Sequence, residues 1–163
     1  MFKKLFALFA IFLTACGWQF KNNELFPQEL RTLSFESADQ YSEMSRILRR
    51  QILLSDIQVI PQDGQVAHLR LNTTQLSSHV ASVFKQAREA EKIISLSVQA
   101  TVRIPNKGEF PLDVALHRTF FDDSRAALAK SEEQESITRQ MYEQASRQLL
   151  IKLAALRKEI EKE

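Results

Sequence analysis

The residue best suited to chemistry is Cys16, the only cysteine in the chain. It follows Leu13-Thr14-Ala15, an apolar residue and then two small ones, which is the pattern of a lipobox. A thiolate is a strong nucleophile, and in a lipobox it takes up a diacylglyceryl group before the leader is cut off. We therefore predict that Cys16 is lipidated and becomes the first residue of the mature protein. The alternative is an ordinary signal peptide followed by an unrelated cysteine.

The residues before Cys16 have the character of a leader. Lys3 and Lys4 precede an apolar run that is too short to span a bilayer, a task that takes about 20 residues. A removable leader over residues 1–15 leaves one domain over residues 16–163, anchored durably if several acyl chains are attached. Lipoproteins that stay in the inner membrane of enteric bacteria tend to carry Asp after the cysteine. Gly17 at that position therefore favours the outer membrane, by a sorting rule known for this class.

Composition, charge and histidine spacing argue against a nucleic-acid partner and against a metal or other cofactor. The chain has 22 basic and 20 acidic residues, and loss of Lys3 and Lys4 with the leader brings its formal charge from +2 to zero. We see no basic stripe interleaved with aromatic residues, so nucleic acid is not an expected partner. The three histidines lack the spacing of a metal site, and we expect no metal or other cofactor: they are His68, His79 and His117.

Adjacent carboxylates at Asp122 and Asp123 are the remaining candidates for catalysis. Carboxylates that are neighbours in sequence more often serve a turn or a helix start than general acid–base chemistry. The chain also lacks a Gly-x-Ser-x-Gly nucleophile motif and a glycine-rich phosphate loop. We predict a protein that is not an enzyme, with a hydrolase built on this carboxylate pair as a minor alternative.

An alternation of apolar and polar residues predicts the centre of the fold. Over residues 94–104 every even-numbered side chain is apolar and every odd-numbered one is polar. The alternation resumes over residues 110–120, interrupted by Arg118, and Pro105-Asn106-Lys107-Gly108 between the two runs is typical of a turn. Two such strands form a long antiparallel hairpin with one buried face and one polar face.

Two amphipathic helices are predicted around this hairpin. The first covers residues 41–55, after a capping-box spacing at Ser37 and Gln40. Its apolar stripe consists of Tyr41, Met44, Ile47, Leu48, Ile52 and Leu54. The second begins near Ser131, which has capping-box spacing with Gln134, and carries an apolar stripe from Ile137 to Ile160. The order β-α-β-β-β-β-α predicts an α+β fold of two layers, with two helices on one face of a roughly four-stranded sheet. The shorter strands are expected at residues 31–35, 57–60 and 67–71.

Several segments together resemble one known family. They are the mature start, a motif before the hairpin, and a long run from the end of the hairpin into the last helix: Cys16-Gly17-Trp18, Ala81-Ser82-Val83-Phe84-Lys85, Arg118-Thr119-Phe120-Phe121-Asp122-Asp123, Ala127-Leu128-Ala129-Lys130, Glu133-Gln134, Met141-Tyr142, Gln148-Leu149 and Lys152-Leu153. The chain is similar to the LptE family of lipopolysaccharide-assembly lipoproteins over essentially the whole mature sequence. The resemblance implies two helices packed on a four-stranded sheet, which agrees with the fold predicted from periodicity.

The resemblance also implies partners and a ligand. LptE proteins plug the large outer-membrane β-barrel LptD, and the pair delivers lipopolysaccharide to the outer leaflet. Members of the family bind lipopolysaccharide through positive side chains on exposed loops, and Lys85 and Lys130 match those positions. Lys85 stands where the familiar motif has Arg, so it keeps the charge but loses the planar fork that grips phosphate. A different interpretation is a periplasmic adaptor of a barrel-assembly machine that has no lipid ligand.

Aromatic residues beside these lysines are candidates for contacts with a partner. Phe120 continues the buried face of its strand, so we predict that it lies in the core. Phe84 and Phe121 either anchor a partner or fold back onto the domain. If the two lysines do not bind lipopolysaccharide, the next candidates lie on the exposed face of the first helix: Arg46, Arg49 and Arg50.

Overall fold

The computed structural model describes residues 26–83 and 89–160. Its helices and strands are, in chain order, β1 (Thr32–Ser37), α2 (Glu43–Leu54), β2 (Gln58–Val59), β3 (Ala67–Val83), β4 (Glu89–Ile104), β5 (Gly108–Asp123), α3 (Ala127–Ala155) and α4 (Arg157–Ile160), with single turns of 3-10 helix at Gln28–Leu30 and Ser124–Ala126. The predicted α+β class and the order of the elements are confirmed. The sheet has five strands and not four, because the two-residue β2 pairs at its edge.

The strand order in the sheet is β2-β1-β3-β4-β5, so the short strands lie at one edge and the long strands at the other. β3, β4 and β5 form a long antiparallel meander, whereas β1 runs parallel to both β2 and β3. β1 pairs only with the stretch Ala67–Leu71 of β3. Beyond that stretch, among the described residues, β3 has a strand partner on one side only. The predicted turn between β4 and β5 is confirmed, and Asn106 (φ 62°) and Gly108 (φ 105°) adopt the left-handed backbone that such residues tolerate.

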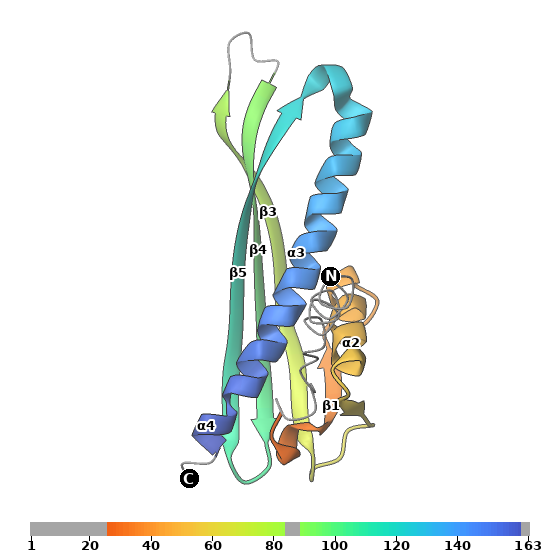
Figure 1. Ribbon diagram of the computed structural model, residues 1–163, viewed down its shortest axis with the longest axis vertical. Coiled ribbons are helices and arrows are strands. Elements are labelled where there is room, and N and C mark those ends of the chain that lie inside the picture. The colour runs from red at the N-terminus through yellow and green to blue at the C-terminus, as the bar shows by residue number, and fades with distance from the viewer. Residues whose placement is uncertain (1–25, 84–88, 161–163) are drawn as a thin grey trace, which may run out of the picture.

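One face of the sheet is apolar and buried, and the other is polar and exposed. The even-numbered side chains from Ile94 to Ile104 in β4 and most of those of β5 point to the buried face, as the alternation predicted. α3 runs along the whole length of the meander, while α2 lies beside its lower part only (Figure 1). Both helices contribute to the core, with Met44, Leu48 and Ile52 from α2 and Met141, Leu149 and Leu153 from α3.

Both helices begin at residues other than those the capping-box spacings suggested. Ser42 and not Ser37 caps α2, because its Oγ accepts a hydrogen bond from the backbone N–H of Ser45 at 3.3 Å, while Ser37 ends β1. α3 begins at Ala127, and the Ser131 Oγ donates to the carbonyl of Leu128 within the helix. The helix of 29 residues is therefore about 44 Å long. No described helix is both long and apolar enough to cross a membrane.

β3 is much longer than the predicted strand at residues 67–71. Its continuation was hidden because two bulges, between Leu71 and Thr73 and between Val80 and Ser82, break the alternation of side chains. After the first bulge Leu76 pairs with Leu96 and so lies on the same face as Leu69, but it is 44% exposed because α2 does not reach it. Two members of the predicted stripe of α2 are also exposed: Tyr41 and Leu54.

Candidate functional site

The upper end of the meander holds the two described site residues that the sequence singled out, Phe121 and Lys130. We call this region the tip and define it by the described segments Val80–Val83, Glu89–Lys92, Thr119–Asp123 and Ala127–Lys130. The register places Lys92 opposite Phe120 and Glu89 opposite Asp123, and α3 starts directly after β5. The tip therefore lies at the opposite end of the molecule from the C-terminus (Figure 1).

Lys130 lies in the first turn of α3 and not in a connecting segment, as the sequence had suggested. Its Nζ forms an ion pair with Glu133 at 2.8 Å and lies 5.5 Å from the centre of the Phe120 ring. Phe120 is buried, as predicted, so its ring is a fixed platform beneath the ammonium group. Only 25% of the Lys130 side chain is exposed. The Phe120 ring and Glu133 thus hold the ammonium group in place, with its charged end at the surface.

The two adjacent aspartates each bind a different cation. Asp122 forms an ion pair with Lys92 at 2.5 Å on the helix-covered face, whereas Asp123 accepts hydrogen bonds from the Arg125 side chain and backbone. The Arg125 side-chain hydrogen bond, followed by its backbone one, lowers the pKa of the Asp123 carboxyl below its ordinary value of 3.8. Because neighbours in a strand point to opposite faces, the two carboxylates cannot act on one substrate as an acid–base pair.

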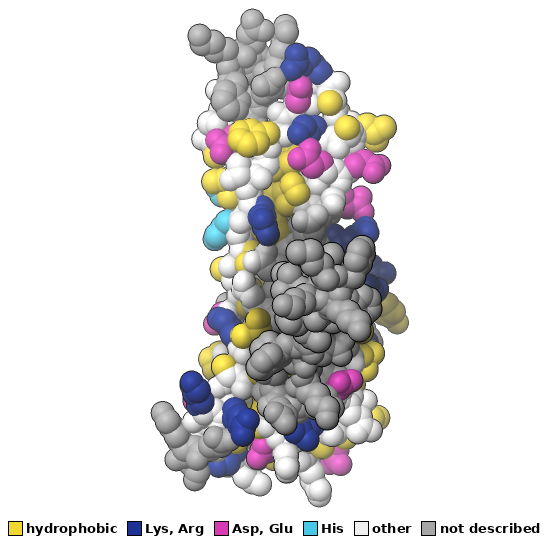
Figure 2. Space-filling model, in the orientation of Figure 1, with side chains coloured by type: hydrophobic (Ala, Val, Ile, Leu, Met, Phe, Trp, Pro, Cys, Tyr) yellow, Lys and Arg dark blue, Asp and Glu magenta, His cyan; other side chains and the backbone are white. Residues whose placement is uncertain are grey.

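Apolar side chains are exposed around these charges. They come from β3, β5 and α3, and all four are more than half exposed: Val80 53%, Val83 60%, Phe121 56% and Leu128 78%. Figure 2 shows hydrophobic, basic and acidic side chains interleaved at the upper end of the molecule, on the face seen in that view. The tip can thus offer both charge and apolar surface to a ligand that carries phosphates and hydrocarbon chains.

Three of the predicted site residues lie outside the described residues: Cys16, Phe84 and Lys85. Phe84 and Lys85 fall in the connection between β3 and β4, whose described flanks Val83 and Glu89 belong to the tip. Phe121 points to the polar face of the sheet, away from the core. The alternative candidates Arg46, Arg49 and Arg50 are exposed on α2, far along the chain from the tip, and Arg49 lies 5.2 Å from the centre of the Phe35 ring.

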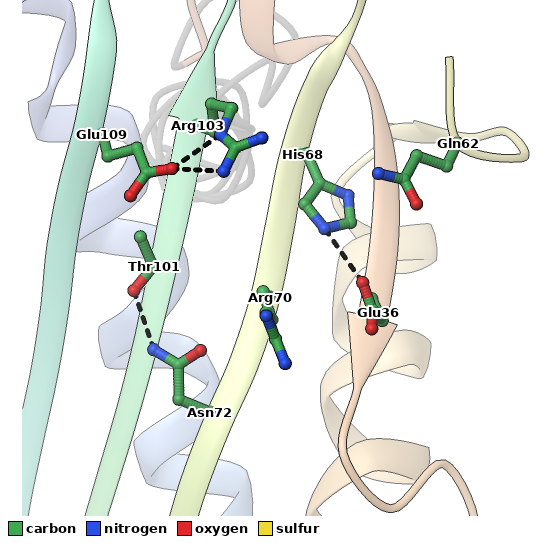
Figure 3. Close-up of a pocket in the computed structure, with 8 residues that line it drawn as sticks. All are labelled: Glu36, Gln62, His68, Arg70, Asn72, Thr101, Arg103 and Glu109. Carbon is green, nitrogen blue, oxygen red and sulfur yellow. Dashed lines mark hydrogen bonds and ion pairs between the residues drawn. The ribbon is translucent and has the colours of Figure 1, made fainter. Parts of the chain in front are cut away.

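A polar hollow on the exposed face of the sheet was missed from sequence. It has a volume of about 340 Å³ and lies over β1, the first part of β3 and the last part of β4 (Figure 3). Arg70 lies between the Arg103–Glu109 ion pair at 2.5 Å and a contact of 3.2 Å between His68 Nε2 and the Glu36 carboxylate. The bulge residue Asn72 donates a hydrogen bond to Thr101 at 2.7 Å.

Only the alternation of polar residues on neighbouring strands could have signalled this hollow. It can present donors and acceptors to a polar partner, but it holds no metal cluster: no three His, Cys, Asp or Glu side chains gather within residues 26–83 and 89–160.

The fold defined by these elements is that of a group of bacterial lipoproteins. It resembles the rare lipoprotein B of Shewanella oneidensis with a TM-score of 0.74 and 31% identity, over 80% of this chain and 98% of that one. The minor lipoprotein of Acinetobacter baumannii has a TM-score of 0.61 at 14% identity, covering 78% of this chain and 95% of that one, and so shares the fold alone. The architecture is therefore one already found in other bacterial lipoproteins.

Sequence comparison identifies the family within this group. The family model LptE, described as lipopolysaccharide-assembly, matches residues 30–153. The LPS-assembly lipoprotein LptE of Pectobacterium atrosepticum is 35% identical over 150 residues, which cover 90% of this chain and 82% of that protein. LptE of Yersinia enterocolitica is 35% identical over 88% of this chain and 71% of its own length. The chain belongs to the LptE family of lipopolysaccharide-assembly lipoproteins.

Proposed function

We propose that this protein is an outer-membrane lipoprotein, anchored through Cys16, that plugs an LptD-type barrel from its periplasmic side and binds lipopolysaccharide at the tip. The observation that carries the ligand site is Lys130, held over the buried Phe120 ring at a tip that also exposes apolar side chains. Lys85 belongs to the connection between two strands that end at the tip, so it supplies a second charge to the same end. Phe84 and Phe121 are then candidate contacts to the partner or the ligand.

The chemistry of the ligand matches this arrangement. Ammonium groups form charge-assisted hydrogen bonds with the phosphates of lipid A, and the exposed apolar residues accept its acyl chains. Lys130 is already paired with Glu133, so a phosphate must displace that carboxylate or share the ammonium group with it. Because both groups stay partly hydrated, each lysine contributes modestly, and the affinity falls as the salt concentration rises.

The polar face of the sheet supports the proposal that this protein plugs a barrel. The interior of an outer-membrane barrel is polar, and a plug needs surfaces that can hydrogen-bond with it. On β3, β4 and β5 this face carries polar side chains, such as Ser77, Ser95 and His117, and towards its lower end it carries the hollow around Arg70. The role is non-catalytic, and lipopolysaccharide is bound, not altered.

Co-purification tests the barrel partner. A form that begins after Cys16, exported by an ordinary signal peptide and co-expressed with the host's LptD-type barrel, is expected to remain in a stable one-to-one complex in detergent. The folded domain makes most of the contacts, so the lipid is not needed. Loss of the complex without the lipid contradicts the plug. Co-purification of other assembly factors in place of this barrel favours the periplasmic adaptor, the alternative function.

Mass spectrometry of the mature N-terminus tests the anchor. In the native host, Cys16 is expected to carry a diacylglyceryl group and an acyl chain, and Cys16→Ala is expected to block both lipid attachment and cleavage by the lipoprotein peptidase. An unmodified Cys16 in the native protein contradicts the proposed lipid anchor, but it does not affect the proposals for the ligand site at the tip and for the barrel contact.

A further inference from the structure

An apolar groove lies between the C-terminal end of α2 and the C-terminal part of α3. Its volume is about 430 Å³, and apolar side chains from both helices line it. Phe26 and Leu150 are buried within it, whereas Leu54 and Ile151 are 66% and 67% exposed. Large aliphatic side chains exposed side by side are a surface that proteins normally cover. Leu54 also belongs to the stripe of α2 that the sequence predicted to be buried, which points to a missing partner.

The groove is where the N-terminal segment joins the domain. Phe26, the first described residue, lines it, so the preceding residues must start from the groove. Between Cys16 and Phe26 the chain carries two aromatic residues, Trp18 and Phe20. Trp18 is eight residues from Phe26, a reach of about 28 Å when extended, so the segment is long enough to turn back along the groove.

We propose that the segment Gly17–Leu25 docks in this groove, with the indole ring of Trp18 packed between Leu54 and Ile151. The groove has room for an indole ring, and the guanidinium group of Arg147, which also lines the groove, can stack on it. Because the segment is tethered at Phe26, its effective concentration at the groove is in the range of millimolar, so a contact of modest strength suffices.

Docking fixes the position of the anchor as well as covering the groove. Only Gly17 separates Trp18 from Cys16, so a docked Trp18 holds the N-terminal cysteine within about 7 Å of chain from the groove. The C-terminal end of α2 and the C-terminal part of α3, which line the groove, lie away from the tip (Figure 1). This consequence for the membrane rests on lipidation of Cys16, whereas the docking itself does not.

The single tryptophan of the chain reports on the docking directly. In the full mature protein in detergent, the Trp18 fluorescence is expected to be blue-shifted and weakly quenched by iodide, an aqueous anion. Leu54→Glu and Ile151→Glu each place a charge in the groove and are expected to shift the emission to the red and raise the iodide quenching constant several-fold. Both positions are exposed, so neither change is expected to unfold the domain, which circular dichroism verifies.

Leu128→Glu is the matched control, because Leu128 is an equally exposed leucine on α3 but lies at the tip. It is expected to leave the emission and the quenching unchanged. The proposal is overturned if the native indole is fully quenched, or if it stays protected in both groove variants, as it would when buried in the detergent. Protection that disappears on dilution shows that a second copy covers the groove, and also overturns it.

Photo-crosslinking identifies what Trp18 contacts. Benzoylphenylalanine placed at Trp18 is expected to form crosslinks within one chain to the α2 peptide containing Leu54 or the α3 peptide containing Ile151. Crosslinks between chains, or only to detergent and lipid, contradict the docking. A failure of these experiments leaves the proposed barrel and lipopolysaccharide contacts unaffected, since neither depends on the groove.

Discussion

The lower half of the sheet and the tip are built from the same strands but in opposite ways. In the lower half, β1 extends the sheet, both helices cover it, and side chains such as Leu69 are fully buried. At the tip only the meander and the start of α3 remain, with ion pairs and exposed apolar residues. Regions that bind ligands or move are drawn from the less stable parts of a protein. The contrast suggests that the lower half holds the fold while the tip is free to bind.

The largest effect expected from this contrast is on stability, and β3 offers a matched pair to measure it. Leu69 and Leu76 lie on the same strand and the same face, but Leu69 is 1% exposed and Leu76 is 44% exposed. We expect Leu69→Ala to lower the free energy of unfolding by about 2–5 kcal/mol, because it leaves a cavity in the core. Leu76→Ala is expected to cost roughly 0.5 kcal/mol or less.

Urea unfolding followed by circular dichroism measures both variants against the unsubstituted protein. Equal losses for Leu69→Ala and Leu76→Ala would mean that the upper part of β3 is as tightly packed as the lower part. The division between a supporting half and a binding tip would then be wrong.

A smaller effect concerns the charge at the end of β5. Arg125 lowers the pKa of the Asp123 carboxyl, so the Asp123 contribution to stability is present above the ordinary pKa of about 3.8 and is lost as the pH falls through the lowered value. Arg125→Gln is expected to bring the Asp123 pKa back towards its ordinary value, as measured by an NMR titration of the carboxyl carbon. An unchanged pKa would show that the aspartate is held by some other group. The global stability is expected to change little, since the pair is exposed.

The sequence predicted the strands and helices in which one buried face gives the apolar residues a regular spacing. The even-numbered residues from Ile94 to Ile104 in β4 and the stripe from Ile137 to Ile160, which continues from α3 into α4, were identified correctly, because one face of each packs on the core. The continuation of β3 was missed, since its two bulges and its exposed side chains remove that regular spacing. Backbone pairing with β4, and not burial, makes these residues a strand, and such pairing between distant segments leaves little trace in local sequence.

The site was predicted in part for a similar reason. Phe120 was predicted to lie in the core because it continues the even-numbered, buried face of its strand, and Lys130 was singled out by the family resemblance. The partners of Lys130 were not predicted, because the start of α3 at Ala127 decides that Glu133 comes within reach. The hollow around Arg70 depends on five separate segments that only the folded sheet brings together.

Binding of lipopolysaccharide by charge-reversed variants tests the central claim most directly. In the domain lacking the lipid, each lysine is expected to contribute roughly 0.3–1 kcal/mol, so Lys85→Glu with Lys130→Glu raises the Kd for lipopolysaccharide about tenfold at low salt, with little change in melting temperature. The matched control, Arg46→Glu with Arg50→Glu, reverses two exposed charges on α2 and is expected to bind as the unsubstituted protein does. If the double lysine variant keeps its full affinity while the arginine variant loses it, the ligand binds at α2 and the tip is not the site.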